Sequence, residues 1–309
     1  MLGLFFVTHR VESPIGSQSP IAPPEKILKV PRVRCPAECK LRTIIIGDIH
    51  GQFESLMALT DELKWHDSCQ TYFCGDLVNV GPNSADVVRW AMENNVKVVL
   101  GNHDLHMLSV MRGKSKARPK DTFHDILEAR DRQEIFDWLV SQPLALSIDA
   151  SHILVHAGVL PGWTEETILE LSGEVEAALR SDPDSFFENM YGNQPSLWSP
   201  EIEGVDRLRI AVNALTRARV LHGDGRLEFE YKGLYDEIPS GLHAWFDLWP
   251  KQNPPQKIIF GHWSALGARD FGNAFALDSG AAWGRELSAL ELSYAQGVAQ
   301  YTLTSVPVI

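Results

Sequence analysis

The chain has 309 residues, of which 44% are hydrophobic and 22% are charged, and 28 basic against 40 acidic residues give a net charge of −12. This composition excludes a wholly disordered chain, a collagen-like repeat and a small disulfide scaffold. A net-negative chain repels duplex DNA, so we expect no such partner. A phosphate-bearing ligand would need locally concentrated positive charge, which bound metal ions could supply.

Residues 1–40 are rich in proline and serine, which predicts an extended or disordered leader before a folded domain of residues 41–309. The four cysteines are too few for a disulfide framework in a chain of this length, and they predict reduced thiols. No apolar stretch reaches the ~18 residues that span a bilayer. We therefore expect a cytoplasmic protein without a membrane partner.

After the leader, short β-branched strands alternate with helices of amphipathic pattern. The predicted strands are 42–48, 71–76, 96–104, 151–158, 257–263, 274–280 and 288–293, and the predicted helical stretches are 55–65, 84–95 and 126–142. Such alternation predicts βαβ units with largely parallel strands. The fold class is therefore α/β, with two sheets and helices outside them.

Several predicted strands end in a small residue followed by a polar side chain that can bind a metal. Because ligands bind beyond the carboxyl ends of strands in α/β sheets, these side chains are expected to converge. The set is Asp48, His50, Asp76, Asn102, His156 and His262. Carboxylates and imidazoles without thiolates favour Mn, Fe, Zn or Co.

Each piece alone has a simpler explanation. A Gly-Asp pair after a strand is usually a turn, and a single histidine such as His262 more often satisfies a hydrogen bond than binds a metal. Asn102 could equally be the N-cap of the helix that follows it. Five occurrences in order, each at a strand end, favour the metal site.

These motifs carry a resemblance to a known family. GDIHGQ, GDLVNVGP, GNHD, HAG and GH, in that order, resemble the metallophosphoesterase superfamily in its phosphoprotein-phosphatase branch. VLGNHDLHML, RPKD, NALTRAR, FGHW and ALDSGAAWG are similar to the bacterial symmetrical bis(5′-nucleosyl)-tetraphosphatase family. The resemblance covers about residues 42–294.

The resemblance implies a two-sheet β-sandwich flanked by helices, a dinuclear metal site at the carboxyl ends of strands and a helical insertion at about 160–220. It implies hydrolysis of diadenosine tetraphosphate into two ADP with two divalent ions, Mn, Co, Fe or Zn. Asp48, His50 and Asp76 would hold the first ion. The second would be held by Asp76, Asn102, His156 and His262. His103 matches the general acid that protonates the leaving phosphate oxygen.

Two positions depart from the superfamily pattern. Asn79 stands where protein phosphatases place the aspartate that partners the catalytic histidine, and we expect it to accept a hydrogen bond from His103 instead. Val80 stands where a phosphate-holding arginine is expected. Among other cations we favour Arg217 over Arg219, because it lies beside Asn213 at helical spacing, although a solvated helix face is an equal alternative.

Base stacking is a further candidate contact. Trp263 directly follows a predicted ligand and could stack on adenine, although most tryptophans serve the core.

Two other functions stay open. The chain could act on phosphoproteins or on nucleoside-tetraphosphate caps of RNA 5′ ends; the missing VDRG speaks against the former. Alternatively, it could bind a metal or nucleotide without turnover, an idea motivated only by Val80.

Overall fold

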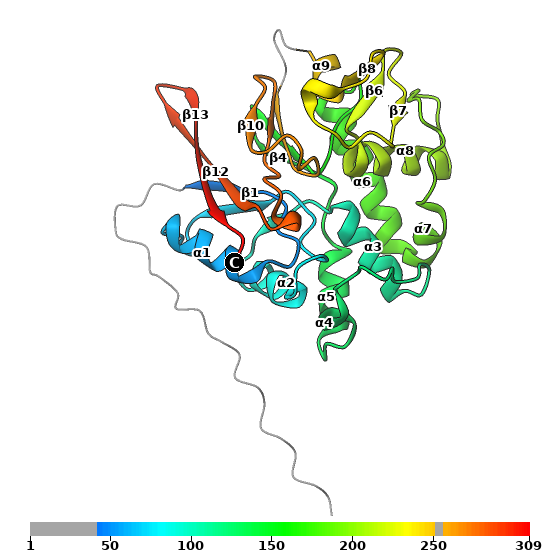
Figure 1. Ribbon diagram of the computed structural model, residues 1–309. Coiled ribbons are helices and arrows are strands. Elements are labelled where there is room, and N and C mark those ends of the chain that lie inside the picture. The colour runs from blue at the N-terminus through cyan, green and yellow to red at the C-terminus, as the bar shows by residue number, and fades with distance from the viewer. Residues whose placement is uncertain (1–41, 251–255) are drawn as a thin grey trace, which may run out of the picture. The chain divides into compact units, whose positions relative to one another are not determined.

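The computed structural model describes residues 42–250 and 256–309, so the leader predicted for residues 1–40 lies outside the described residues. The core consists of two five-stranded sheets (Figure 1). The first has the order β13-β12-β1-β2-β3 and contains β1 (Thr43–Ile46), β2 (Gln70–Phe73), β3 (Lys97–Val98), β12 (Glu286–Ala295) and β13 (Val298–Pro307). The second has the order β10-β11-β9-β5-β4 and contains β4 (Ala145–Asp149), β5 (His152–Val155), β9 (Lys257–Phe260), β10 (Arg269–Asp270) and β11 (Ala274–Ala276).

The central strands of both sheets are parallel. β1 pairs with β2 and β2 with β3, while β5 pairs with β9 and β9 with β11, all in parallel register. The antiparallel partners β12, β4 and β10 lie outside these trios. The carboxyl ends of each trio therefore meet at one edge of its sheet, as the alternation of strands and helices predicts.

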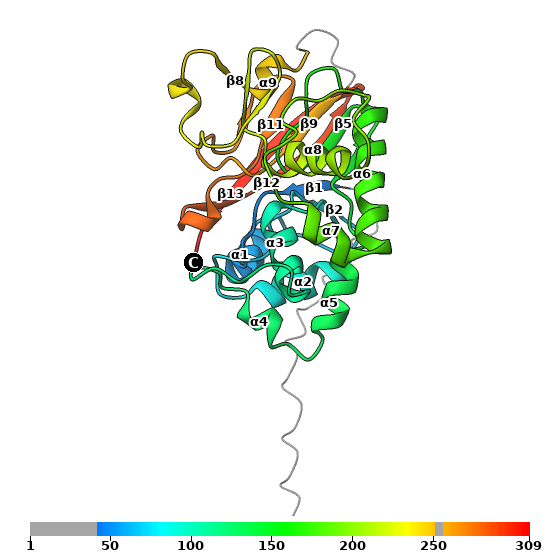
Figure 2. The same ribbon diagram turned by 90° about the vertical axis from the view of Figure 1, so that its right-hand side faces the viewer.

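Helices cover the outer faces of the sheets, and Figures 1 and 2 show them outside the strands. The helices are α1 (Phe53–Glu62), α2 (Ser84–Glu93), α3 (Asn102–Met111), α4 (His124–Leu127), α5 (Arg132–Leu139), α6 (Glu165–Ser181), α7 (Pro183–Asn189), α8 (Gly204–Arg217) and α9 (Trp245–Leu248). A small third sheet of order β7-β6-β8 follows α8, with β6 (Val220–His222), β7 (Leu227–Glu228) and β8 (Leu242–Ala244). The α/β prediction with two sheets and outer helices is confirmed.

A layer of apolar side chains joins the two sheets. Ile45 and Tyr72 of the first sheet and Leu154 and Ile259 of the second are fully buried in one cluster. Burial of a large apolar side chain contributes about 1.5–3 kcal/mol. This layer fixes the two sheets against each other and so sets the distance between their strand ends.

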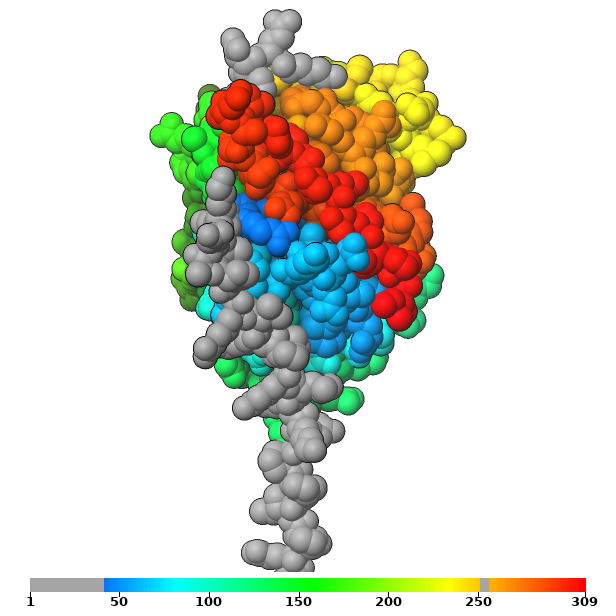
Figure 3. Space-filling model, turned by 90° about the vertical axis from the view of Figure 1, so that its left-hand side faces the viewer, coloured from blue at the N-terminus to red at the C-terminus, as the bar shows by residue number. Residues whose placement is uncertain are grey.

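The observed strands are mostly shorter than the predicted ones, and the clearest differences concern β3, the helical stretch 126–142 and β13. The strand expected over 96–104 is only two residues long, because the Leu100 N–H leaves the ladder and donates to the carbonyl of Pro143. The helical stretch 126–142 is divided between α4 and α5. Strand β13, which the pattern did not indicate, follows a tight turn at Gln296 and Gly297, both with positive φ. Figure 3 shows β13 as a red band across one face of the molecule.

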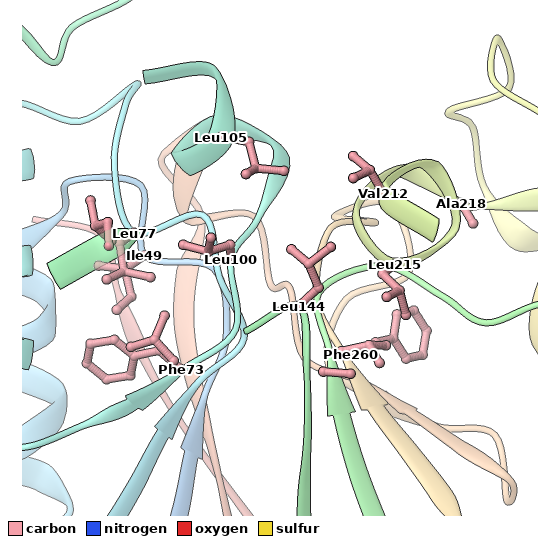
Figure 4. Close-up of a cluster of buried hydrophobic side chains, with 14 of the residues drawn as sticks. Ile49, Phe73, Leu77, Leu100, Leu105, Leu144, Val212, Leu215, Ala218 and Phe260 are labelled. Carbon is pink, nitrogen blue, oxygen red and sulfur yellow. The ribbon is translucent and has the colours of Figure 1, made fainter. Parts of the chain in front are cut away.

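Buried apolar residues anchor the loops after the first three strands. Ile49, Leu77 and Leu100 follow β1, β2 and β3, and all three are fully buried (Figure 4). Each lies within two residues of a predicted metal ligand in the sequence. The core therefore holds the backbone of the predicted site.

Asp104, in the first turn of α3, ties two of these loops together. Its carboxylate accepts hydrogen bonds from the N–H groups of Leu77 and Gly101, each at 2.9 Å, and it is fully buried. One side chain thus fixes the loop after β2 to the loop after β3.

We expect Asp104→Ala to lower the free energy of unfolding by about 2–6 kcal/mol, because two buried N–H groups lose their acceptor at about 1–3 kcal/mol each. Denaturant unfolding measures the change. The control is Asp61→Ala on the exposed side of α1, which is expected to stay within about 0.5 kcal/mol of wild type. Equal effects of the two substitutions would contradict the assigned role of Asp104.

Candidate metal centre

The carboxylate of Asp76, in the loop after β2, lies at the centre of the predicted ligands. Its Oδ2 is 3.6 Å from Nε2 of His50 and 3.4 Å from Nε2 of His156. Among residues 42–250 and 256–309, two groups of side chains have ligand atoms close enough to hold an ion, and both contain Asp76: one with His50 and His103, the other with His156 and His262. The structure therefore brings together residues that come from both sheets.

Backbone carbonyls set the ring tautomers of two histidines. His156 donates from Nδ1 to the carbonyl of Cys74 at 2.8 Å, and His262 donates from Nε2 to the carbonyl of Arg217 at 3.2 Å. A carbonyl can only accept, so in the neutral rings the proton lies on Nδ1 of His156 and on Nε2 of His262, and the opposite nitrogens are open to a metal. These are the bare nitrogens that a metal requires, and such outer hydrogen bonds orient histidine ligands in metal sites.

When His156 is neutral, three acceptor atoms converge beside Asp76. Nε2 of His156 is 3.3 Å from Oδ1 of Asn102 and 3.4 Å from Oδ2 of Asp76. Three acceptors at this separation repel one another unless a proton or a metal ion lies among them, and although burial opposes it, the Asp76 and Asp48 carboxylates raise the pKa of His156 to about 10. The donor set and its polarity therefore fit a divalent metal ion.

Buried carboxylates add to the excess of negative charge. Asp48, Asp76 and Asp278 are 2%, 2% and 4% exposed. Burial, and then the neighbouring Asp278 carboxylate, raise the pKa of Asp48 well above its usual range. Burial likewise raises the pKa of Asp278 to about 6. Buried charges of one sign are stable only when paired or metal-bound, so this crowding also fits bound cations.

The backbone at the site is bent into the left-handed region. His50, Asp76 and His262 have φ of 52°, 48° and 64°. Val80 has φ of 70°, which is unusual for a β-branched residue. Each such position costs about 1–3 kcal/mol and persists only where its surroundings enforce it, which is typical of functional sites.

A cavity of about 440 Å³ opens beside these ligands. Its walls include His50, Asp76, Asn102, His103 and His262, and also three cations, Arg219, Lys232 and Arg285. Lys232 and Arg285 have exposed side chains, whereas Arg219 is half-buried and donates to the carbonyl of His262 at 3.1 Å. Burial lowers the pKa of Arg219 to about 10, so it stays charged at neutral pH.

Arg217, the cation favoured from the sequence, is not among the residues that line this cavity. Its guanidinium donates to Asn213 and Asn193 and lies 4.4 Å above the ring of Phe229, whereas Arg219 lines the cavity. Arg217 ends α8, so the chain turns before Arg219 and the helical spacing no longer applies. Arg217 does lie beside Asn213, as the helical spacing predicts, but the hydrogen bond between them holds the guanidinium away from the cavity.

Two tryptophans border the cavity in different ways. Trp263 is 1% exposed and donates to the carbonyl of Gly233, so most of its surface belongs to the core. Trp283 is 72% exposed at the rim, where its indole donates to the Ser264 hydroxyl at 3.1 Å. Trp283 therefore presents more free ring surface than the predicted Trp263.

The hydrogen bond predicted between Asn79 and His103 is present with the opposite direction. Nδ2 of Asn79 lies 3.0 Å from Nδ1 of His103, so the amide donates and the ring accepts. The reason is that Oδ1 of Asn79 already accepts from the N–H groups of Val80 and Thr122, each at 2.9 Å.

Sequence reasoning missed Asp278, Lys232 and Arg285. A signal for Asp278 was present, since it follows a strand and precedes Ser-Gly, as other predicted ligands precede glycine. Lys232 and Arg285 lie in irregular segments, and only the tertiary structure brings them to the cavity.

Carboxylates and imidazoles at strand ends, beside a cavity with cationic walls, define a metal-dependent hydrolase of phosphate esters or anhydrides. The family model described as calcineurin-like phosphoesterase matches residues 41–181. A protein of Methylobacillus flagellatus named bis(5′-nucleosyl)-tetraphosphatase, symmetrical, is 43% identical over 82% of this chain and 92% of its own length. A protein of the same name from Neisseria meningitidis is 42% identical over 80% of this chain and 91% of its own.

The chain therefore belongs to the calcineurin-like phosphoesterase family, in its group of symmetrical bis(5′-nucleosyl)-tetraphosphatases. The crystal structure of a candidate diadenosine tetraphosphatase shares the fold, with a TM-score of 0.58 at 21% identity, over 87% of this chain and 95% of the other. The resemblance inferred from the sequence motifs is confirmed. Membership implies bound divalent metal ions. Among the described residues, no helix is long and apolar enough to cross a bilayer.

We expect Gly101→Ala to remove metal from the site, because its Cβ would lie 2.1 Å from Oδ1 of Asp76. Elemental analysis of the purified variant measures the metal content. The matched control is Gly173→Ala in α6, where no atom lies within 4 Å of the new Cβ and stability should rise by about 0.5–1 kcal/mol. Full metal content in Gly101→Ala would show that the ion does not depend on the position of Asp76.

Proposed function

We propose that this chain hydrolyses diadenosine tetraphosphate symmetrically into two molecules of ADP. The observation that carries the proposal is the shared Asp76 carboxylate, which stands between two groups of metal-ligating side chains at a cavity with cationic walls. The names of the relatives from M. flagellatus and N. meningitidis support the same substrate. The catalytic domain spans residues 41–309, with a helical insertion at about 160–220.

Two divalent ions, Mn, Co, Fe or Zn, would occupy the site. Asp48, His50 and Asp76 would hold the first ion. The second would be held by Asp76, Asn102, His156 and His262. When bound, two such ions activate water near neutral pH and offset the charge of phosphate oxygens.

The cations of the cavity bind the rest of the polyphosphate. Arg219, Lys232 and Arg285 line the same cavity as the ligands, so they can neutralise phosphates that lie outside the metal site. Val80 presents an apolar surface at this cavity, and the guanidinium of Arg219 takes the place of the arginine that position 80 lacks. Trp283 offers its exposed face to a base.

In the reaction, the oxygen of water bonds to one inner phosphorus, and the bond from that phosphorus to the central bridging oxygen breaks. The electron pair of the broken bond stays on the bridging oxygen, which leaves as a terminal oxygen of the second ADP. The protons of water pass to solvent. His103 lines the cavity and serves the departing oxygen through its ring N–H.

Product analysis tests the proposal. The metal-loaded protein is incubated with diadenosine tetraphosphate in ¹⁸O-water, and the nucleotides are separated by ion-exchange chromatography. We expect ADP alone, with one ¹⁸O for every two molecules. AMP with ATP would show that an outer bridge is broken and would contradict symmetrical cleavage. Cleavage of only a phosphoprotein or a capped RNA, or of nothing, would also overturn the proposal.

Two arginines that are two residues apart give a matched pair for the phosphate contact. Arg219→Gln is expected to lower kcat/KM by about 10²–10³, the usual loss for one charge-stabilising donor. Arg217→Gln should lower it less than about fivefold, because its guanidinium binds Asn213 and Phe229. Steady-state kinetics on diadenosine tetraphosphate compare the two. A larger loss for Arg217→Gln would place the phosphates on the α8 side.

A further inference from the structure

Symmetrical cleavage requires room for two identical arms of the substrate. The central bridging oxygen of diadenosine tetraphosphate carries an adenosine with two phosphates on each side. The cavity beside the metal ligands takes one arm, with three cations for its phosphates and Trp283 for its base. The second arm must pass over another part of the surface. It needs contacts of the same chemistry there, a cation for phosphate and an aromatic ring for adenine.

Tyr191 is an exposed aromatic side chain that the first arm does not use. Within residues 42–250 and 256–309, the most exposed aromatic side chains are Trp283, Tyr294 and Tyr191, at 72%, 51% and 45%. Tyr294 donates to Asp149 in the hairpin before β5, at the opposite end of that strand from His156. Tyr191 and Trp283 are therefore the two exposed rings that remain for the two adenines.

The hydroxyl of Tyr191 is held in place while its ring stays free. It lies 3.2 Å from Nδ1 of His106, and Nε2 of the same histidine lies 2.9 Å from Oδ2 of Asp121. His106 and Asp121 are buried. An aromatic ring that is already fixed at its polar end loses little further freedom when a base stacks on its face. Trp283 is held in the same way by its bond to Ser264.

Hydrogen bonds connect Tyr191 to the first turn of α3. Beyond His106, Oδ1 of Asp121 accepts from Nδ2 of Asn79 at 2.9 Å. The same amide nitrogen lies 3.0 Å from Nδ1 of His103. A path of three buried side chains therefore joins Tyr191 to His103, so the exposed ring lies close to the metal centre.

The two exposed rings lie on opposite sides of α3. In both Figure 1 and Figure 2, α3 stands between α7, which Tyr191 follows, and the orange segment 281–283, which ends in Trp283. His103 is in the first turn of α3 and lines the cavity that Trp283 borders. An arm that runs past His103 and away from Trp283 therefore meets Tyr191.

Arg118 places a cation beside this ring. Its backbone N–H donates to Oδ2 of Asp121 at 2.6 Å. Burial raises the pKa of Tyr191, and the positive charges of Arg118 and Arg217 oppose the rise, so both guanidiniums are within electrostatic reach of its hydroxyl. The guanidinium of Arg217 is already engaged by its own helix and by Phe229. Arg118 is thus the cation that can serve a ligand on Tyr191.

The other basic residues at the start of this loop are paired. Arg112 contacts Asp184 at 2.6 Å and Lys114 contacts Glu188 at 2.5 Å, and both acids belong to α7. These ion pairs tie the loop to the helix that Tyr191 follows. In the ranges that the structure describes, no carboxylate pairs with the exposed Arg118, so its charge is available to a phosphate.

We infer that Tyr191 and Arg118 bind the second arm of the substrate, the ring against its adenine and the guanidinium on a phosphate. The inference deepens the proposed function and rests on it. The arm on this side of His103 is the departing ADP, because His103 serves the departing oxygen. Both adenines then stack on a ring that is held at its polar end.

A truncated substrate tests the inference. Adenosine 5′-tetraphosphate keeps the central bridge but has one adenosine, and its cleavage there by water gives ADP and pyrophosphate. Tyr191→Ala is expected to lower kcat/KM on diadenosine tetraphosphate by about tenfold or more through KM, the usual effect of losing a base stack. On adenosine tetraphosphate the loss should stay below about threefold, because its adenosine can bind at Trp283 instead.

Tyr191→Phe is the matched control for the ring. It keeps the stacking face and loses the contact with His106, so kcat/KM on diadenosine tetraphosphate should fall less than in Tyr191→Ala. Equal losses in the two variants, or equal losses on the two substrates, would show that Tyr191 acts by holding His106 and would overturn the inference.

Arg118→Gln tests the phosphate contact. We expect KM for diadenosine tetraphosphate to rise by about tenfold, the usual effect of losing one hydrogen bond between charged groups. Lys116→Gln removes the same charge from the same loop, and it should change KM by less than about twofold. Equal effects of the two substitutions would indicate a general field of the loop and would overturn the role of Arg118.

A readout on the wild-type, metal-loaded protein needs no variant. An analogue with a methylene group in place of the central bridging oxygen is not cleaved there, and 2-azido groups on its adenines crosslink under light to adjacent side chains. We expect label on Tyr191, in tryptic peptide 181–207, and on Trp283, in peptide 270–285. Label on 270–285 alone would overturn the inference. Wild type that does not cleave diadenosine tetraphosphate to ADP would instead defeat the proposed function.

Discussion

The position of the Asp76 carboxylate is the constraint on which the rest of the site depends. One of its oxygens accepts a hydrogen bond from the backbone N–H of His103 at 2.8 Å, and the other faces the rings of His50 and His156. The residue is nearly fully buried and has a left-handed backbone. Such a conformation needs support from every side. The buried side chains of Ile49, Leu77 and Leu100 after the strands provide this support, together with the hydrogen bonds that Asp104 accepts.

The polarity of neighbouring groups determines what each histidine can do. Carbonyls that accept from His156 and His262 leave a bare nitrogen on each ring, which suits a metal ligand. The amide that donates to His103 leaves its proton on the opposite nitrogen, which suits a hydrogen-bond donor. One residue type thus serves two purposes, and the backbone or side-chain partner of each ring distinguishes them.

Charge explains why an acidic protein can bind a polyanion. The net charge of −12 is spread over the chain, whereas the buried carboxylates concentrate it where divalent ions can offset it. The cavity walls add Arg219, Lys232 and Arg285. With divalent ions bound, the charge at the cavity would be opposite to the net charge of the chain, which would suit a polyphosphate.

The sequence by itself determined the α/β fold, the parallel strands and the residues at their carboxyl ends, because strand ends, glycines and polar side chains recur in a fixed local order. Only the tertiary structure decided which cation reaches the cavity, since the turn after α8 separates Arg219 from Arg217. It also decided the direction of the bond between Asn79 and His103. Asp121 and Thr122 lie more than forty residues from Asn79, so no local pattern could reveal which end of the amide they hold.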